Sequence, residues 1–163
     1  MKKLPTLESV NSWLKYNPET GFFICIRRKQ GSRPIGSIVG SKNGNGYLSI
    51  CCDRTKVFAH RLAWFISYGA WPIGEIDHIN GIREDNRLCN LRDVPRTCNM
   101  QNRRKASSLS RTGFLGVWIS GKKFSAVITI HRKRISLGHF NTPEEAHQAY
   151  LEAKRVLHPG CTI

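Results

Sequence analysis

The first part of the chain alternates short apolar runs with turn residues. A helical spacing of apolar side chains predicts a short amphipathic helix ending near Asn17-Pro18, built on Leu7, Val10, Trp13 and Leu14. Runs of β-prone residues follow at 21–26, 35–39, 47–52 and 56–58. Gly44-Asn45-Gly46 supplies a hairpin turn between two of them. We therefore predict a helix followed by a small antiparallel meander.

The middle of the chain predicts two helices with two short strands between them. A helix is expected over residues 60–68, and a strand end over 76–79, where isoleucines flank Asp77-His78. A second short strand over 88–94 has apolar residues on both sides of Asn90. The next helix, over 95–105, begins with a proline, which suits the first turn because its missing N–H has no partner there.

The last part of the chain has the two-residue period of strands. Short strands are predicted over 116–119, 123–130 and 134–137, and the middle one has an apolar face of Phe124, Ala126, Ile128 and Ile130. That face needs a cover, which we predict is a helix over 143–157, capped by Asn141 or Thr142. The helix would pack through Ala146, Ala149, Tyr150, Ala153 and Val156.

Together these elements predict an α+β protein of two modules. We expect an N-terminal helix and β-meander extension over 1–59 and a core over 60–104. A Ser-rich linker without periodicity would follow over 105–112, and then a three-stranded antiparallel sheet packed on one helix over 113–158.

The charge of the chain favours a polyanionic partner. The 163 residues carry a formal net charge of +15, and from Val94 to Pro143 there are ten Lys or Arg and no Asp or Glu. Nucleic acid is the default polyanion for such a chain. A membrane surface is the rival, but there is no long apolar run, signal-peptide pattern or lipidation motif, so we expect a soluble intracellular protein without a membrane partner.

The six cysteines do not suggest a metal or disulfide framework. They stand at positions 25, 51, 52, 89, 98 and 161, and none forms a Cys-x-x-Cys pair. We interpret them as thiols in a reducing compartment.

The acidic residues gather where the candidate chemistry lies. Five of the eleven Asp and Glu fall between Glu75 and Asp93, beside a cluster of His and Asn. Asp77 and His78 would arrive together at a strand end, and Asn99 would project from the following helix back over the two strands. Oxygen donors of this kind suit a hard divalent ion, and a histidine is the usual general base near neutral pH.

At these residues the sequence resembles the HNH nucleases of ββα-metal fold, in the branch found among phage homing endonucleases. The matching positions are Asp77-His78, Asn90 and Asn99. The resemblance implies that His78 is the general base, that Asn90 holds the loop and the His78 ring, and that Asp77 and Asn99 bind the metal. Asn99 stands where other members have a third His, which favours Mg²⁺ or Mn²⁺ over Zn²⁺.

The same resemblance implies an endonuclease that hydrolyses phosphodiester bonds in double-stranded DNA, leaving 5′-phosphate and 3′-hydroxyl ends. We expect it in the cytoplasm of a bacterial or phage-infected cell. The segment starting at His60 is similar to the one that precedes the catalytic strand in this branch, and we expect a structural role for His60 at the helix start rather than a contact with DNA or the site.

The C-terminal module resembles the AP2 DNA-binding domain, in which the uncovered face of a three-stranded sheet enters the major groove. The resemblance rests on Gly113-Phe-Leu-Gly-Val117, Leu137-Gly-His-Phe140 and Thr142-Pro-Glu-Glu-Ala146. Carried over by position, it implies that Trp118, Lys123, Val127, Thr129, Arg134 and Ser136 face DNA. Leu115, Trp118 and Thr129 stand where plant members have Arg, so the target sequence does not transfer.

Two other functions remain open from the sequence. One is a non-catalytic AP2-type DNA-binding regulator, and the other is a protein that binds or cleaves RNA. A single site per chain indicates a nick and a monomer on an asymmetric target, whereas a dimer or two successive nicks would break both strands.

Overall fold

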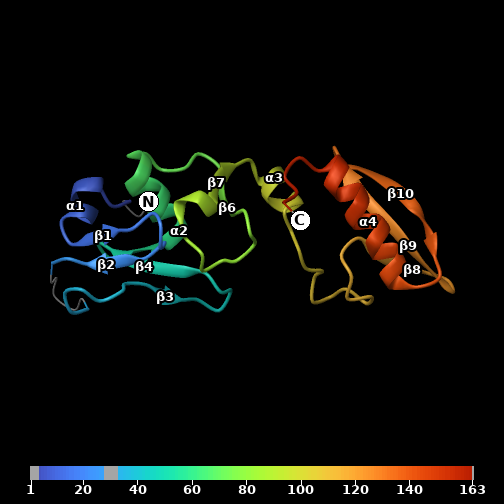
Figure 1. Ribbon diagram of the computed structural model, residues 1–163, viewed down its shortest axis with the longest axis horizontal. Coiled ribbons are helices and arrows are strands. Elements are labelled where there is room, and N and C mark those ends of the chain that lie inside the picture. Colours follow the sequence, from blue (N-terminus) through green and yellow to red (C-terminus); the bar gives the residue numbers. More distant parts are fainter. Residues whose placement is uncertain (1–3, 28–32, 163) are drawn as a thin grey trace. The chain divides into compact units, whose positions relative to one another are not determined.

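The computed structural model describes residues 4–27 and 33–162, in two compact units that divide between Val94 and Pro95. Each unit has a hydrophobic core of its own. Both mix helices and antiparallel strands, so the predicted α+β class is confirmed (Figure 1). Within the described residues, no helix combines the length and apolar character needed to cross a membrane.

The first unit begins with a short helix and a two-stranded sheet. Helix α1 (Leu7–Asn11) is capped by Thr6, whose hydroxyl accepts a hydrogen bond from the Ser9 N–H. Strand β1 (Leu14–Tyr16) pairs antiparallel with β2 (Phe23–Cys25). The prediction of a helix to Asn17 was therefore wrong after Asn11. Leu14 and Tyr16 are buried by strand alternation, which their spacing also permits.

A three-stranded sheet and a helix follow in the first unit. Strands β3 (Ser41–Lys42), β4 (Leu48–Cys52) and β5 (Thr55–Phe58) lie in that order, and α2 (Ala59–Tyr68) ends at Gly69 in the left-handed region. The strand predicted over 35–39 was wrong, because only Ile38 makes an isolated bridge, to Ile24. Pro34 and a positive φ at Gly36 interrupt the extended chain there.

A hairpin with a long loop completes the first unit. Strand β6 (Glu75–His78) pairs antiparallel with β7 (Leu91–Val94), and the 3₁₀ turn η1 (Leu88–Asn90) leads into β7. The second strand predicted over 88–94 therefore begins only at Leu91. The loop between the strands, residues 79–87, carries the polar residues discussed below.

The second unit consists of a short helix and a sheet covered by a long helix. Helix α3 (Arg96–Gln101) is shorter than predicted, and Asn102 is its C-cap. Strands β8 (Val117–Ser120), β9 (Lys123–Ile130) and β10 (Lys133–Phe140) form an antiparallel sheet in the order β10-β9-β8. Helix α4 (Pro143–Leu157) lies along one face of this sheet, as Figure 1 shows within the red and orange part of the chain.

Helix α4 begins with the predicted cap and packs through a narrower stripe than predicted. Thr142 and Glu145 form a capping box with Pro143 in the first turn. Ala146 and Tyr150 are buried against Val117, Ala126 and Ile128. Val156, predicted to face the sheet, is 82% exposed. Lys154 is buried instead, and its ammonium donates a hydrogen bond to the Arg103 carbonyl, which closes the C-terminal end of the stripe.

Candidate active site

Asp77 and His78 end strand β6 with both side chains buried. Arg92 lies opposite Asp77 in the β6–β7 register and donates to Asp77 Oδ2 from Nε at 2.9 Å and from Nη2 at 2.7 Å. The carboxylate is therefore held in one orientation and largely screened from water. Losing Arg92 would leave a buried negative charge without its partner.

The ring of His78 is held by Asn86 of the loop. His78 Nε2 and Asn86 Oδ1 lie 3.3 Å apart, and Asn86 Nδ2 donates to the Glu84 carbonyl, which fixes the orientation of the amide. Because an amide oxygen only accepts, Nε2 carries the hydrogen and Nδ1 is the basic nitrogen in this arrangement. Asn86 is itself buried, and its carbonyl accepts from the Tyr16 hydroxyl at 2.7 Å.

The pKa of His78 is lowered, mainly because burial disfavours the charged ring. The hydrogen bond to Asn86 and the charges of Asp77 and Asp85 act in the opposite direction, and the charge of Arg83 adds to the lowering. His78 is therefore neutral at physiological pH, which is the protonation state a general base needs before it accepts a proton.

Asn90 joins the two ends of the loop. Its side chain accepts from the Asn80 N–H at 2.9 Å and donates to the Asp85 carbonyl at 2.8 Å. Its own carbonyl accepts from the Ile79 N–H. Asp85 strengthens the closure by accepting from Asn80 and from Arg87, and these contacts lower its pKa to about 2. The loop next to His78 is thus closed by hydrogen bonds between its own residues.

Two aromatic rings, Tyr47 and His60, contact His78, and Phe58 packs against both of them; we call Tyr47, Phe58 and His60 the aromatic cage. The rings of His60 and His78 meet edge to face with centroids 5.1 Å apart, and Tyr47 lies 5.9 Å from His78. His60 stacks on Phe58 at 5.3 Å and meets Tyr47 edge to face at 5.3 Å. The expectation that His60 makes no contact with the site was therefore wrong. No local pattern indicates this arrangement, because His60 and Tyr47 stand 18 and 31 residues before His78.

Asn99 stands on α3 in the second unit. It is half-buried, and its N–H donates to the Pro95 carbonyl within the first turn of that helix. Asp77 belongs to the first unit, and the convergence of Asn99 with Asp77 stays a prediction. Within residues 4–27 and 33–162, no three His, Cys, Asp or Glu side chains gather in a way that could hold a metal ion.

The segment that carries this cluster is similar to a known family. Residues 57–101 match the HNH endonuclease family. The match includes Asp77, His78, Asn86, Asn90 and Asn99, and it supports a nuclease that acts on DNA. Comparisons with curated proteins and with solved structures give no match for the chain.

Outside the HNH segment, the six residues predicted to face DNA share one face of the second unit's sheet. The antiparallel register pairs Thr129 with Arg134 and Val127 with Ser136, on the face opposite to the buried Ala126 and Ile128. Lys123 and Trp118 lie on the same face by alternation. We call this side, away from α4, the open face of the sheet.

The open face holds one more polar residue that the sequence pattern did not predict, His139. The β9–β10 register shifts between Ser136 and Gly138, so the extra residue Leu137 forms a bulge. After the bulge His139 pairs with Ser125, which pairs in turn with Trp118. The bulge therefore brings the exposed His139 onto the open face, which strict alternation from Arg134 does not predict. The Arg134 guanidinium lies 5.2 Å from the centre of the Trp118 ring.

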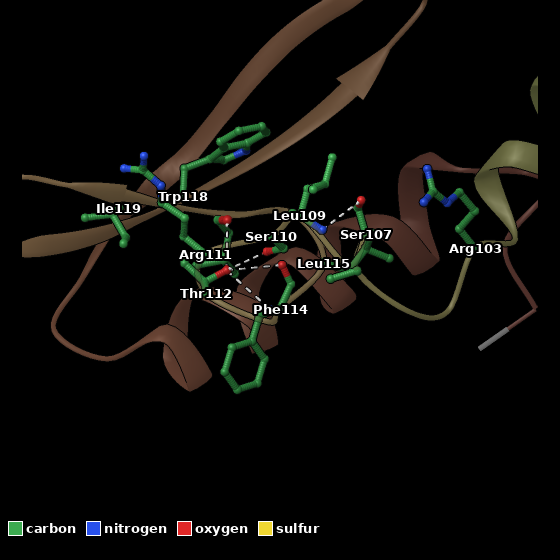
Figure 2. Close-up of a pocket in the computed structure, with 13 residues that line it drawn as sticks. Arg103, Ser107, Leu109, Ser110, Arg111, Thr112, Phe114, Leu115, Trp118 and Ile119 are labelled. Carbon is green, nitrogen blue, oxygen red and sulfur yellow. Dashed lines mark hydrogen bonds between the residues drawn. The ribbon is translucent and has the colours of Figure 1, made fainter.

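A pocket of about 660 Å³ lies in the second unit, beside β8 (Figure 2). Residues of the predicted linker form part of its wall, and Thr112 ties them to the sheet by accepting from the Phe114 N–H and donating to the Val117 carbonyl. Its lining is mostly apolar and includes Leu109, Phe114, Leu115 and Trp118. None of the residues around His78 belongs to it, so the pocket is separate from the HNH cluster.

Proposed function

We propose that this chain is a metal-dependent endonuclease that hydrolyses a phosphodiester bond in double-stranded DNA. The observation that carries the proposal is the buried pair Asp77-His78 inside the HNH match, with His78 neutral and its Nε2 hydrogen directed at Asn86. The family match supports the reaction class, and the hydrogen bond from Nε2 is the reason for assigning the proton transfer to Nδ1.

In this mechanism His78 is the general base. Nδ1 takes a proton from a water molecule while the water oxygen attacks phosphorus, and the bond from phosphorus to the 3′ oxygen breaks. The products are a 5′-phosphate and, after the leaving oxygen gains a proton from solvent, a 3′-hydroxyl. General-base help of this kind contributes about 10²- to 10⁴-fold to the rate. Asn86 and Asn90 position the base and its loop.

A divalent ion fits the donor chemistry of the chain. Asp77 offers a buried carboxylate, and Asn99 offers an amide oxygen, a set that suits Mg²⁺ or Mn²⁺. When bound, the ion would act as a Lewis acid for the charge that develops on the phosphate and on the leaving oxygen. Arg92 orients the Asp77 carboxylate. In this proposal β6, β7 and α3 supply a ββα-metal arrangement of the homing-endonuclease type.

The second unit would hold the DNA as an AP2-like module. Its open face presents Arg134 and Lys123 as cations, with Trp118 as an exposed aromatic ring and Thr129 and Ser136 as hydroxyl groups. Cations that contact phosphates supply affinity, and side chains that reach base edges supply sequence preference. Val127, half-buried at the centre of the face, would pack against the groove. We expect a monomer that makes one nick.

Incubation with supercoiled plasmid tests the reaction. The native protein should convert supercoiled DNA to nicked circles with Mg²⁺ or Mn²⁺ and stop when a chelator is added. A DNA ligase should reseal the nicks without prior phosphorylation, since that requires 5′-phosphate and 3′-hydroxyl ends. Binding of plasmid without cleavage under either ion, across several bacterial and phage DNAs, would support the regulator instead, and preferred cleavage of RNA would contradict the substrate.

A further inference from the structure

His60 is a buried imidazole that the proposed chemistry does not use. It is the second residue of α2 and is 7% exposed. Its Nδ1 is buried and has no hydrogen-bond partner within the described residues. Burial, with the charges of His78 and Arg61, lowers the pKa of His60 to about 3, so the ring is neutral at physiological pH. His60 therefore neither supplies charge nor shares a proton with His78 near pH 7.

What His60 does supply is a surface against the His78 ring. Their centroids are 5.1 Å apart with the planes at 87°, which is the preferred edge-to-face arrangement of aromatic pairs. One face of His60 is covered by Phe58, whose ring is within 12° of parallel. Tyr47 contacts both histidines. Phe58 and Tyr47 thus hold the His60 ring in the orientation in which it contacts His78.

The hydrogen bond to Asn86 restrains the His78 ring at Nε2. A hydrogen bond at one ring nitrogen restrains one point of a ring and does not by itself stop the ring plane from tilting about that point. A second contact from an aromatic ring removes this tilt. A proton transfer from water requires Nδ1 to be aimed within hydrogen-bond reach, so a tilted ring lowers the rate.

The cage is also tied to the loop that carries Asn86. The Arg83 guanidinium lies 4.9 Å from the centre of the Tyr47 ring, and Arg83 donates to the Asn45 carbonyl at 2.6 Å. Lys42 and Glu84 form an ion pair between the same two segments. The hairpin that carries Tyr47 and the loop that carries Asn86 are therefore fixed to each other, and they contact His78 from different sides.

From these contacts we infer that His60 is a positioning residue for His78 and acts through the packing of its ring, not through its nitrogens. The inference rests on the proposed nuclease function of His78. It predicts that a ring of similar shape without nitrogen can replace the imidazole, and that a small side chain cannot.

The test compares His60→Ala and His60→Phe in the full chain, with Val10→Ala as a matched control. Val10 is fully buried in the same core, on α1, so its truncation loosens packing without a contact to His78. We expect His60→Ala to lower kcat for nicking about 10- to 100-fold with KM for DNA nearly unchanged, as misplacement of a reacting group does. His60→Phe should stay within about threefold of native, because it restores the ring. Val10→Ala should lower the melting temperature but keep kcat.

A second readout does not depend on cleavage. Relaxation of the His78 Cε1–H group by NMR reports how far the ring is restrained, and the ring order should fall in His60→Ala and stay native in His60→Phe. Unchanged order and kcat in His60→Ala would overturn the inference, and so would equal damage by both substitutions. If the native protein cuts no DNA while the NMR result is as expected, the nuclease function fails and the positioning of His78 stands.

Discussion

At the scale of single residues, burial sets the protonation of the histidines next to β6. The folded His60 has a pKa of about 3, against an ordinary value of 6.5. The unfolded chain takes up a proton at that histidine as the pH falls below 6.5, and the folded chain does not. The stability associated with neutral His60 is therefore complete above pH 6.5 and is lost progressively as the pH falls toward 3.

A first prediction is that the first unit loses stability between pH 7 and pH 5. A His60 that stays neutral at pH 5 accounts for a loss of about 2 kcal/mol, from 1.5 pH units at 1.36 kcal/mol each. Denaturant unfolding followed by tryptophan fluorescence measures it, because Trp13, Trp64 and Trp71 lie in this unit. The His60→Phe variant should show a shallower pH dependence, and equal slopes in both proteins would contradict the protonation argument.

The order of polar residues along the chain was enough to select Asp77, His78 and Asn90 as candidates, but not their partners. Asn86 follows Asp85 in what looks like ordinary turn chemistry, yet it is buried because Tyr16 and the loop enclose it. Tyr16 stands 70 residues away in sequence. Contacts of this range depend on the packed fold, and no local pattern contains them. The role of Asn99 as a metal ligand stays a prediction.

At the scale of elements, short apolar spacings left helix and strand undecided. The positions of Trp13 and Leu14 fit both the helical and the strand period. Residues 14–16 form a strand because they pair with β2. The longer C-terminal elements were predictable because they have a clear period, a capping box and turn residues. The bulge at Leu137 was not predictable, because it depends on how β10 pairs with β9.

The turn before β2 buttresses the loop next to His78, and a second prediction follows from it. Gly21 has φ +74°, and a Cβ there would lie 2.6 Å from the Arg87 nitrogen and 2.7 Å from the Asn86 carbonyl carbon. Gly21→Ala should destabilise the first unit by about 2–4 kcal/mol and slow nicking, because it combines strain with a displaced Asn86. Thermal unfolding and plasmid nicking measure the two effects.

Gly36 provides the matched control for Gly21. It has φ +83° but open space around its Cα, so Gly36→Ala adds the backbone strain alone, about 1–2 kcal/mol. Nicking by folded Gly36→Ala should be native. If the two variants were equally stable and equally active, the close approach at Gly21 would have no role in positioning Asn86.

At the scale of the whole molecule, the net charge of +15 favours a polyanion, and in the proposed function the open face would supply the contacts with DNA. Each phosphate neutralised by a cation releases counterions, so the binding constant falls with salt in proportion to the number of such contacts. Arginine contacts and aromatic contacts can therefore be told apart by their salt dependence.

A third prediction separates Arg134 from Trp118 on the open face. Arg134→Ala should weaken binding of duplex DNA and reduce the slope of log K against log salt by about one. Trp118→Ala should weaken binding by about tenfold with the slope unchanged, because an aromatic ring displaces no counterion. Titrations between low and moderate salt measure both the affinity and the slope. Val156→Ala is the control, because Val156 is an exposed residue of α4, which covers the other face of the sheet. Native affinity and slope in both variants would show that DNA does not bind this face.

The role of His78 is tested by the single-turnover nicking rate of supercoiled plasmid, compared between native protein and His78→Ala at equal DNA occupancy with Mg²⁺. We expect a loss of about 10²- to 10⁴-fold in His78→Ala while both proteins shift duplex DNA equally. A native nicking rate in His78→Ala with binding retained would show that the cluster on β6 is not the active site.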